Sequence, residues 1–163
     1  EMRDKLSAAG AGLADLYSDL QELSRGMHPA VLSKGGLPAA LRALARRSTV
    51  PVELTVEVDR RLPESVEVAG YYAAAEALTN AAKHAQAEVV TIDAELDDDG
   101  LHLSITDDGV GGATAGAGSG LMGLRDRVEA LSGALTVASE PGGGTRITAM
   151  IPIAEPRPSR PIC

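Results

Sequence analysis

Apolar and polar residues alternate with period two in short segments of this chain, and this pattern constrains the fold more than any other feature. From Val52 to Val58, valine and leucine alternate with glutamate and threonine, which is typical of a half-buried β-strand. The run Asp97-Asp98-Asp99-Gly100 ends in Asp-Gly, a strong signal for a hairpin turn. The pattern predicts a sheet whose other strands are Glu88–Leu96, Leu101–Thr106, Ala134–Ser139 and Thr145–Ile153.

Helical segments are expected between and before these strands. Pro38–Arg47 predicts a short helix with proline near its first turn and with Leu41 and Leu44 facing inward. Pro63–Ala85 predicts a longer helix, and a third helix with an apolar stripe ends at Gly133.

The two ends of the chain differ from its centre. Met2–Met27 places apolar residues at alternating steps of four and three, the heptad spacing of a helix that packs on a partner helix. Packing of this stripe on the chain's own domain remains an alternative. The proline-rich end predicts a disordered tail. We therefore expect a helical arm and linker over residues 1–35, a domain over residues 36–153 and the tail over residues 154–163.

Composition excludes several classes of function. The formal net charge is -8 and the pI about 4.8, so direct binding to nucleic acid is not expected. Aromatic residues make up only 2% of the chain, so a nucleobase would have to be held without aromatic stacking. The single cysteine, Cys163, excludes an intramolecular disulfide and favours a reducing, cytoplasmic location. Apolar runs are too short for a membrane span of about 18 residues, so no direct membrane contact is expected.

One face of the predicted helix Pro63–Ala85 carries side chains suited to a metal-phosphate site. Glu76, Asn80, Lys83 and His84 have offsets that place them within an arc of roughly 100° in an α-helix. An asparagine oxygen suits Mg2+, which is completed by waters and substrate phosphates. Glu76 can orient or deprotonate a nucleophile, and Lys83 can meet phosphate charge. A polar face that is only solvated is the alternative at this point.

Glycine-rich segments follow this helix. Asp107 stands at the end of a strand and opens the run Asp-Asp-Gly-Val-Gly-Gly, where its carboxylate can accept a hydrogen bond from an exocyclic amine. An ordinary glycine turn with solvated aspartates is the alternative. Gly118, Gly120 and Gly123 match the dinucleotide fingerprint, but a loop of small residues separates them from the preceding strand, which argues against a dinucleotide fold. A glycine loop that opens a helix N-terminus still favours phosphate. Thr145, after a glycine turn, adds a hydroxyl.

Taken in order, these motifs resemble the ATP-binding boxes of sensor histidine kinases. The resemblance spans about Gly36 to Ile153, within the superfamily that also includes gyrase, the Hsp90 chaperones and MutL. The run Gly-Leu-x-Gly-Leu-Arg-Asp-Arg is similar to the branch that is paired with helix-turn-helix response regulators. The implied fold is of the Bergerat type, an α/β two-layer sandwich in which helices cover one face of a mixed sheet. The motifs are Glu76-x-x-x-Asn80-x-x-Lys83-His84, Asp107-x-Gly109-x-Gly111, Gly118-x-Gly120-Leu121-x-Gly123-Leu124-Arg125 and Gly143-Gly144-Thr145.

The resemblance also implies a role for each motif in binding ATP and Mg2+. Asn80 would bind Mg2+ and phosphate, Glu76 would assist phosphoryl transfer, and Lys83 and His84 would line the phosphate side. Asp107 would take the adenine amino group. The remaining residues would shape the adenine wall (Gly109 and Gly111), form the nucleotide lid (Gly118, Gly120, Leu121 and Gly123) and close the adenine side (Thr145).

The resemblance implies a protein-histidine kinase that forms a homodimer and phosphorylates a response regulator with a helix-turn-helix output. The helix that should carry the acceptor histidine is not found in this chain, so we expect ATP binding without self-phosphorylation. His28, His84 and His102 do not fit the acceptor role. One alternative is an anti-sigma-factor serine kinase, which the heptad stripe and the run Arg125-Asp126-Arg127 disfavour. The other is a non-catalytic ATP-gated interaction module, which the presence of Glu76 disfavours.

Overall fold

A computed structural model describes residues 29–112 and 119–153, and all structural statements concern this part of the chain. Backbone contacts divide the chain into Glu1–Ala30 and Val31–Cys163, and almost all described residues belong to the second unit. The second unit begins a few residues before the expected domain start at Gly36. The heptad stripe over Met2–Met27, Gly118 and the tail expected over residues 154–163 lie outside the described residues.

The centre of the second unit is a five-stranded mixed sheet. In spatial order its strands are β1, β2, β3, β5 and β4. β1 runs parallel to β2, and the remaining neighbours are antiparallel. The predicted hairpin at Asp97–Gly100 joins β2 to β3, as its Asp-Gly ending indicated. The strands are β1 (Val52–Glu57), β2 (Val90–Leu96), β3 (Gly100–Asp107), β4 (Ala134–Ser139) and β5 (Thr145–Pro152).

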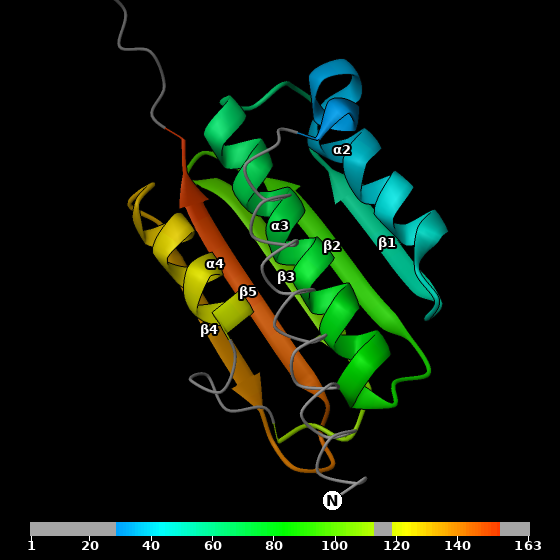
Figure 1. The fold of residues 1–163 in the computed structure, drawn as a ribbon. Coiled ribbons are helices and arrows are strands. Elements are labelled where there is room, and N and C mark those ends of the chain that lie inside the picture. Colours follow the sequence, from blue (N-terminus) through cyan, green and yellow to red (C-terminus); the bar gives the residue numbers. More distant parts are fainter. Residues whose placement is uncertain (1–28, 113–118, 154–163) are drawn as a thin grey trace, which may run out of the picture. The chain divides into compact units, whose positions relative to one another are not determined.

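Helices cover one face of this sheet (Figure 1). They are α2 (Ala30–Arg47), α3 (Glu64–Asn80), which continues as the π-helix η1 (Ala81–Ala85), and α4 (Ser119–Glu129). The expected two-layer sandwich with a mixed sheet is therefore confirmed.

Two helices depart from the sequence prediction. α2 begins at Ala30 rather than Pro38, because a break at Gly36 (φ 64°, ψ -168°) joins two helical pieces end to end. Pro38 thus stands in the first turn of the second piece, where proline is tolerated. The segment expected as one α-helix to Ala85 changes at Ala81 into a π-helix, whose i→i+5 hydrogen bonds widen the turn.

Small side chains bring α3 close to the sheet and replace the aromatic core that this sequence lacks. Ala69, Ala73 and Ala74 are fully buried. Gly70 sits between α2 and β3, where an added Cβ would lie 3.1 Å from Leu37 and 3.3 Å from Leu101. Aliphatic residues of the strands fill the rest of the core.

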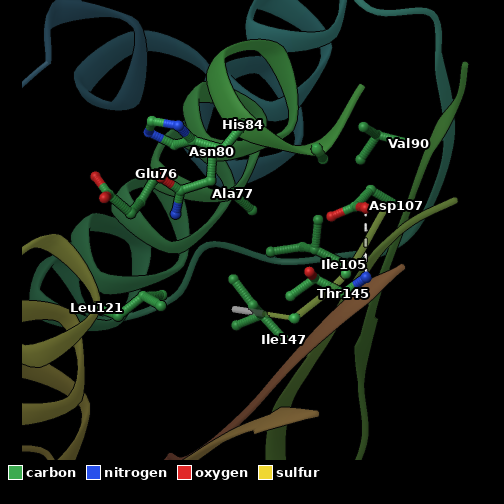
Figure 2. A pocket seen from close by; sticks show the side chains of 13 residues that line it. Glu76, Ala77, Asn80, His84, Val90, Ile105, Asp107, Leu121, Thr145 and Ile147 are labelled. Carbon is green, nitrogen blue, oxygen red and sulfur yellow. Dashed lines mark hydrogen bonds between the residues drawn. The ribbon is translucent and has the colours of Figure 1, made fainter. Parts of the chain in front are cut away.

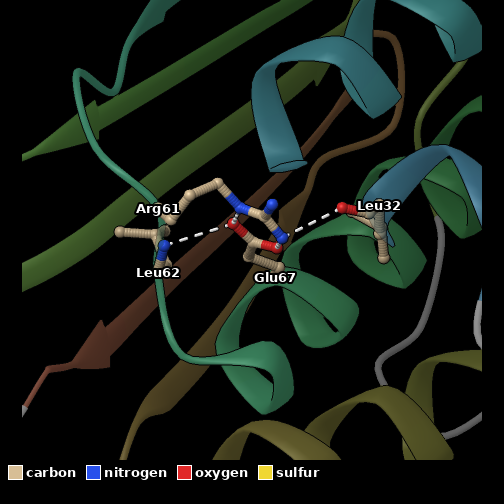
Figure 3. A network of polar contacts seen from close by, with 4 residues as sticks. All are labelled: Leu32, Arg61, Leu62 and Glu67. Atoms are coloured by element: carbon tan, nitrogen blue, oxygen red, sulfur yellow. Dashed lines mark hydrogen bonds and ion pairs between the residues drawn. The ribbon is translucent and has the colours of Figure 1, made fainter. Parts of the chain in front are cut away.

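A buried carboxylate fastens α2 to the start of α3 (Figure 3). Glu67 is 1% exposed and accepts hydrogen bonds from Arg61 Nε and Nη2, each at 2.9 Å, and from the backbone N–H of Leu62 at 3.2 Å. Arg61 Nη2 also donates to the carbonyl of Leu32 at 3.0 Å, which ties the first piece of α2 into the same network. Burial alone would raise the pKa of Glu67, but Arg61 and the N–H groups of Leu62 and Leu37 together lower it.

Candidate functional site

The strand register places two polar residues, Asp107 and Thr145, side by side at one end of the helix-facing side of the sheet. Val90 of β2 and Thr145 of β5 are the register partners of Asp107 in β3. The next row on this face is Ile92, Ile105 and Ile147, which is buried. The apolar core therefore ends at the row that contains Asp107.

A cavity of about 340 Å³ opens between this end of the sheet and α3 (Figure 2). This volume lies in the range of small-ligand pockets, which are mostly apolar with a few convergent polar groups. Figure 2 shows Glu76, Asn80 and His84 on one side of the cavity and Asp107 and Thr145 on the other. The lining residues are Glu76, Ala77, Asn80, His84, Ala85, Val90, Ile105, Asp107, Gly111, Gly112, Leu121, Thr145 and Ile147.

Three of the four predicted helix-face residues line the cavity. Glu76 and Asn80 come from the last turns of α3, and His84 comes from the π-helix. Lys83 is exposed and is not among the lining residues. Lys83 and His84 both follow Ala81, where the wide turn begins, so the α-helical offsets do not fix the direction of either side chain, although His84 lines the cavity as expected.

Asp107 is fixed through one carboxylate oxygen. Its Oδ1 accepts hydrogen bonds from the backbone N–H of Gly109 at 2.9 Å and of Thr145 at 3.3 Å. The described residues give Oδ2 no hydrogen-bond partner, and the carboxylate is directed toward the cavity in Figure 2. The site thus presents a fixed acceptor to any ligand beside Ile105 and Thr145.

The two glycines predicted for the adenine wall, Gly109 and Gly111, and Gly144 of the last glycine motif stand where the backbone approaches other backbone atoms too closely for a side chain. An added Cβ on Gly109 would overlap the carbonyl oxygen of Ala85, and one on Gly144 would overlap that of Asp107. Gly111 has φ 62° and would bring a Cβ onto the carbonyl of Glu140. Gly111 lines the cavity, whereas Gly109 is not among the lining residues.

The start of α4 contacts the side of the cavity that carries Glu76. An added Cβ on Gly120 would overlap the carboxylate of Glu76, so this carboxylate lies against the first turn of the helix. Leu121 lines the cavity. A Cβ on Gly123 would meet nothing within 4 Å, so its predicted lid role has no close contact in the described residues.

Sequence reasoning missed the apolar lining and one acid. Val90, Ile105 and Ile147 form much of the lining, and the sequence analysis placed them only within predicted strands. Asp108 was not singled out, although its Oδ1 accepts hydrogen bonds from the N–H of Glu88 at 2.8 Å and of Val89 at 3.1 Å. These two N–H groups lower the pKa of Asp108. No local sequence pattern indicates these hydrogen bonds, because the donors lie about twenty residues before Asp108.

The site offers little for a metal by itself. Within residues 29–112 and 119–153, no three acids, histidines or cysteines come together as metal ligands. A cation here would need oxygens from a bound ligand beside Asn80, which is the way Mg2+ usually binds with phosphates. In the same part of the chain, no helix is both long and apolar enough to cross a membrane.

Comparisons with known proteins agree with this geometry. Residues 65–155 match the family described as histidine kinase-, DNA gyrase B-, and HSP90-like ATPase. The chain is 28% identical to the oxygen sensor histidine kinase NreB of Staphylococcus carnosus, over 88% of this chain and 44% of NreB. It is 32% identical to the signal transduction histidine-protein kinase/phosphatase UhpB of Salmonella typhimurium, over 91% of this chain and 33% of UhpB. It therefore spans less than half the length of either relative.

The fold is also similar to that of solved structures. The crystal structure of the ATP binding domain of PrrB from Mycobacterium tuberculosis aligns with a TM-score of 0.55 at 23% identity. The alignment covers 73% of this chain and 92% of that domain. This likeness supports the same arrangement of sheet and helices.

Proposed function

Because this chain belongs to the histidine kinase-, DNA gyrase B-, and HSP90-like ATPase family and carries the ATP-binding domain of sensor histidine kinases, we propose that it donates the γ-phosphoryl group of ATP to a histidine on a separate helix. The observation that carries the proposal is the cavity, which has a fixed acceptor, Asp107, at one side and the Glu76 to His84 face at the other.

The adenine is assigned to the Asp107 side. Oδ2 of Asp107 can accept a hydrogen bond from the exocyclic amine, whereas guanine presents a carbonyl at the same place. Ile105 and Ile147 offer apolar contact to the ring, which suits a cavity without aromatic lining. Thr145 Oγ1 lies beside this wall and forms a hydrogen bond of 2.9 Å with Ser139.

The phosphates and Mg2+ are assigned to the α3 side. The Asn80 side-chain oxygen would hold Mg2+, with the remaining positions taken by phosphate oxygens and water. Bound Mg2+ would neutralise charge that develops on the phosphates during transfer. Glu76 would orient or deprotonate the attacking nucleophile, and His84 would face the phosphates.

Phosphorylation of a supplied acceptor helix tests this function. The helix, fused ahead of Glu1 and incubated with γ-labelled ATP, should gain an acid-labile label, as phosphohistidine does. The chain without it should bind ATP and remain unlabelled. Glu76→Ala and Asn80→Ala should abolish the label, because positioning of the γ-phosphate and nucleophile dominates such reactions. An acid-stable label on serine would instead favour the anti-sigma-factor kinase.

We further propose that this domain lies in the cytoplasm, and that the parent kinase acts as a homodimer and passes the phosphoryl group to a response regulator with a helix-turn-helix output. Support comes from the sequence resemblance and from the relatives, which are named as sensor or signal transduction histidine kinases. The predicted dimer contact is the heptad stripe over Met2–Met27, and sedimentation of versions with and without this segment tests it.

A further inference from the structure

The turn that follows Asp107 is held from behind by the residue next to it. Asp108 is exposed and does not line the cavity, but its Oδ1 accepts two backbone hydrogen bonds, from Glu88 and Val89. The backbone N–H of Asp108 also donates to the carbonyl of Val89 at 3.4 Å. Asp108 therefore fastens the segment that leads from the π-helix into β2.

This fastening is continuous with the cavity wall. The backbone N–H of Val110 donates to the carbonyl of Ala85 at 2.7 Å, and Gly109 approaches the same carbonyl too closely to allow a Cβ. Ala85 and Val90, at the two ends of the fastened segment, both line the cavity. Asp108 and Val110 thus hold the segment between Ala85 and Val90 against the end of β3, where Val90 is also the strand partner of Asp107.

We propose that Asp108 is a positioning residue for nucleotide recognition, which fixes the segment from Ala85 to Val90 against the end of β3 so that adenine meets Asp107 in the right geometry. The proposal rests on the assignment of adenine to Asp107 made above. Hydrogen bonds weaken steeply when their angle falls, so a wall that shifts by a fraction of an ångström changes how well Asp107 meets the exocyclic amine. Asp108 does not touch the nucleotide in this arrangement.

A positioning role predicts that loss of Asp108 changes the affinities for ATP and GTP by different factors. If Asp108 only stabilised the fold, its loss would weaken ATP and GTP by the same factor. If it positions the adenine wall, its loss weakens ATP much more than GTP, because guanine gains nothing from Asp107 in the parent chain. The ratio of the two affinities therefore separates positioning from stability.

Displacement of a fluorescent ATP analogue by ATP and by GTP, with Mg2+ present, measures this ratio. Asp108→Ala should lower the affinity for ATP by about ten-fold and reduce the preference over GTP by a similar factor. Asp108→Asn should keep both within about two-fold, because an amide oxygen can still accept both N–H bonds. Asp93→Ala is the matched control, since Asp93 is an exposed acid of β2 on the opposite face of the sheet. Thermal melting confirms that each variant is folded.

Asp107→Asn separates failure of this proposal from failure of the function. Suppose that the parent prefers ATP, that Asp107→Asn loses this preference and that Asp108→Ala keeps it. The positioning role of Asp108 is then wrong, and the assignment of adenine to Asp107 stands. If the parent shows no preference for ATP, the assignment to Asp107 and the positioning role are both wrong. An equal loss of ATP and GTP affinity in Asp108→Ala also overturns the positioning role and leaves only a structural one.

Discussion

Replacing Glu67 by alanine should lower the free energy of unfolding by about 3 kcal/mol, because several buried donors lose their acceptor together. The backbone N–H of Leu62 donates to this carboxylate at 3.2 Å, and that of Leu37 also bonds to it. Leu37 is fully buried and Leu62 is 7% exposed, and a buried N–H left without a partner costs about 1–3 kcal/mol. The Arg61 side chain is 57% exposed, so it regains water and adds little to the loss.

Urea unfolding followed by circular dichroism measures this effect. Glu67→Gln keeps an acceptor oxygen and should cost about 1–2 kcal/mol, and Glu53→Ala, on the exposed side of β1, should stay within about 0.5 kcal/mol of the parent. The pKa of Glu67 is lowered in the folded state, so its contribution is present above the unfolded pKa of about 4.3 and is lost as pH falls through the folded pKa. Glu67→Gln should lack this part of the acid dependence. If Glu67→Ala is as stable as Glu53→Ala, the network does not fasten α2.

Two further predictions concern the cavity. Asn80→Ala should weaken ATP binding by at least about ten-fold in Mg2+ and much less in EDTA, because the lost side-chain oxygen acts through the cation. Calorimetry measures both affinities, and equal losses under the two conditions would contradict this. Gly120→Ala should displace the Glu76 carboxylate and abolish labelling of the supplied acceptor helix. Its free energy of unfolding in urea should stay within about 1 kcal/mol of the parent, because the added methyl group meets only the end of the flexible Glu76 side chain. Gly123→Ala on the same helix meets open space and serves as the stability control; labelling that survives in Gly120→Ala would show that the position of Glu76 does not matter.

Much of the fold could be predicted from local patterns. All five strands were predicted, β1 and β3 from period-two alternation and the others from their place beside predicted turns, and the ends of β4 were predicted without error. The break in α2 carried a visible signal, the pair Gly35-Gly36 ahead of Pro38, although the prediction began the helix only at Pro38. No sequence signal indicated the π-helix, because Ala81–Ala85 contains residues that also suit an α-helix.

The site could be predicted only in part, because its geometry depends on distant pairings. Asp107 was expected at a strand end, but its bond to the N–H of Thr145 joins positions 38 apart and requires the register of β3 with β5. The offsets of Lys83 and His84 were worked out for an α-helix, whereas both residues lie in a π-helix that the sequence did not indicate. Asp108 looked like a solvated turn residue, since nothing near it in the sequence shows that Glu88 and Val89 would donate to it.

The mixed topology of the sheet has a consequence for the order of folding. β2 with β3 and β4 with β5 are hairpins with short turns, which close at small entropic cost, whereas β3 meets β5 only after the chain between them has been spanned. Parallel pairing of β1 with β2 must likewise wait for α3 to cross over. The row of Val90, Asp107 and Thr145 therefore forms only when the two hairpins join. A nucleotide held by that row would slow unfolding of the domain and leave the rate of hairpin formation unchanged.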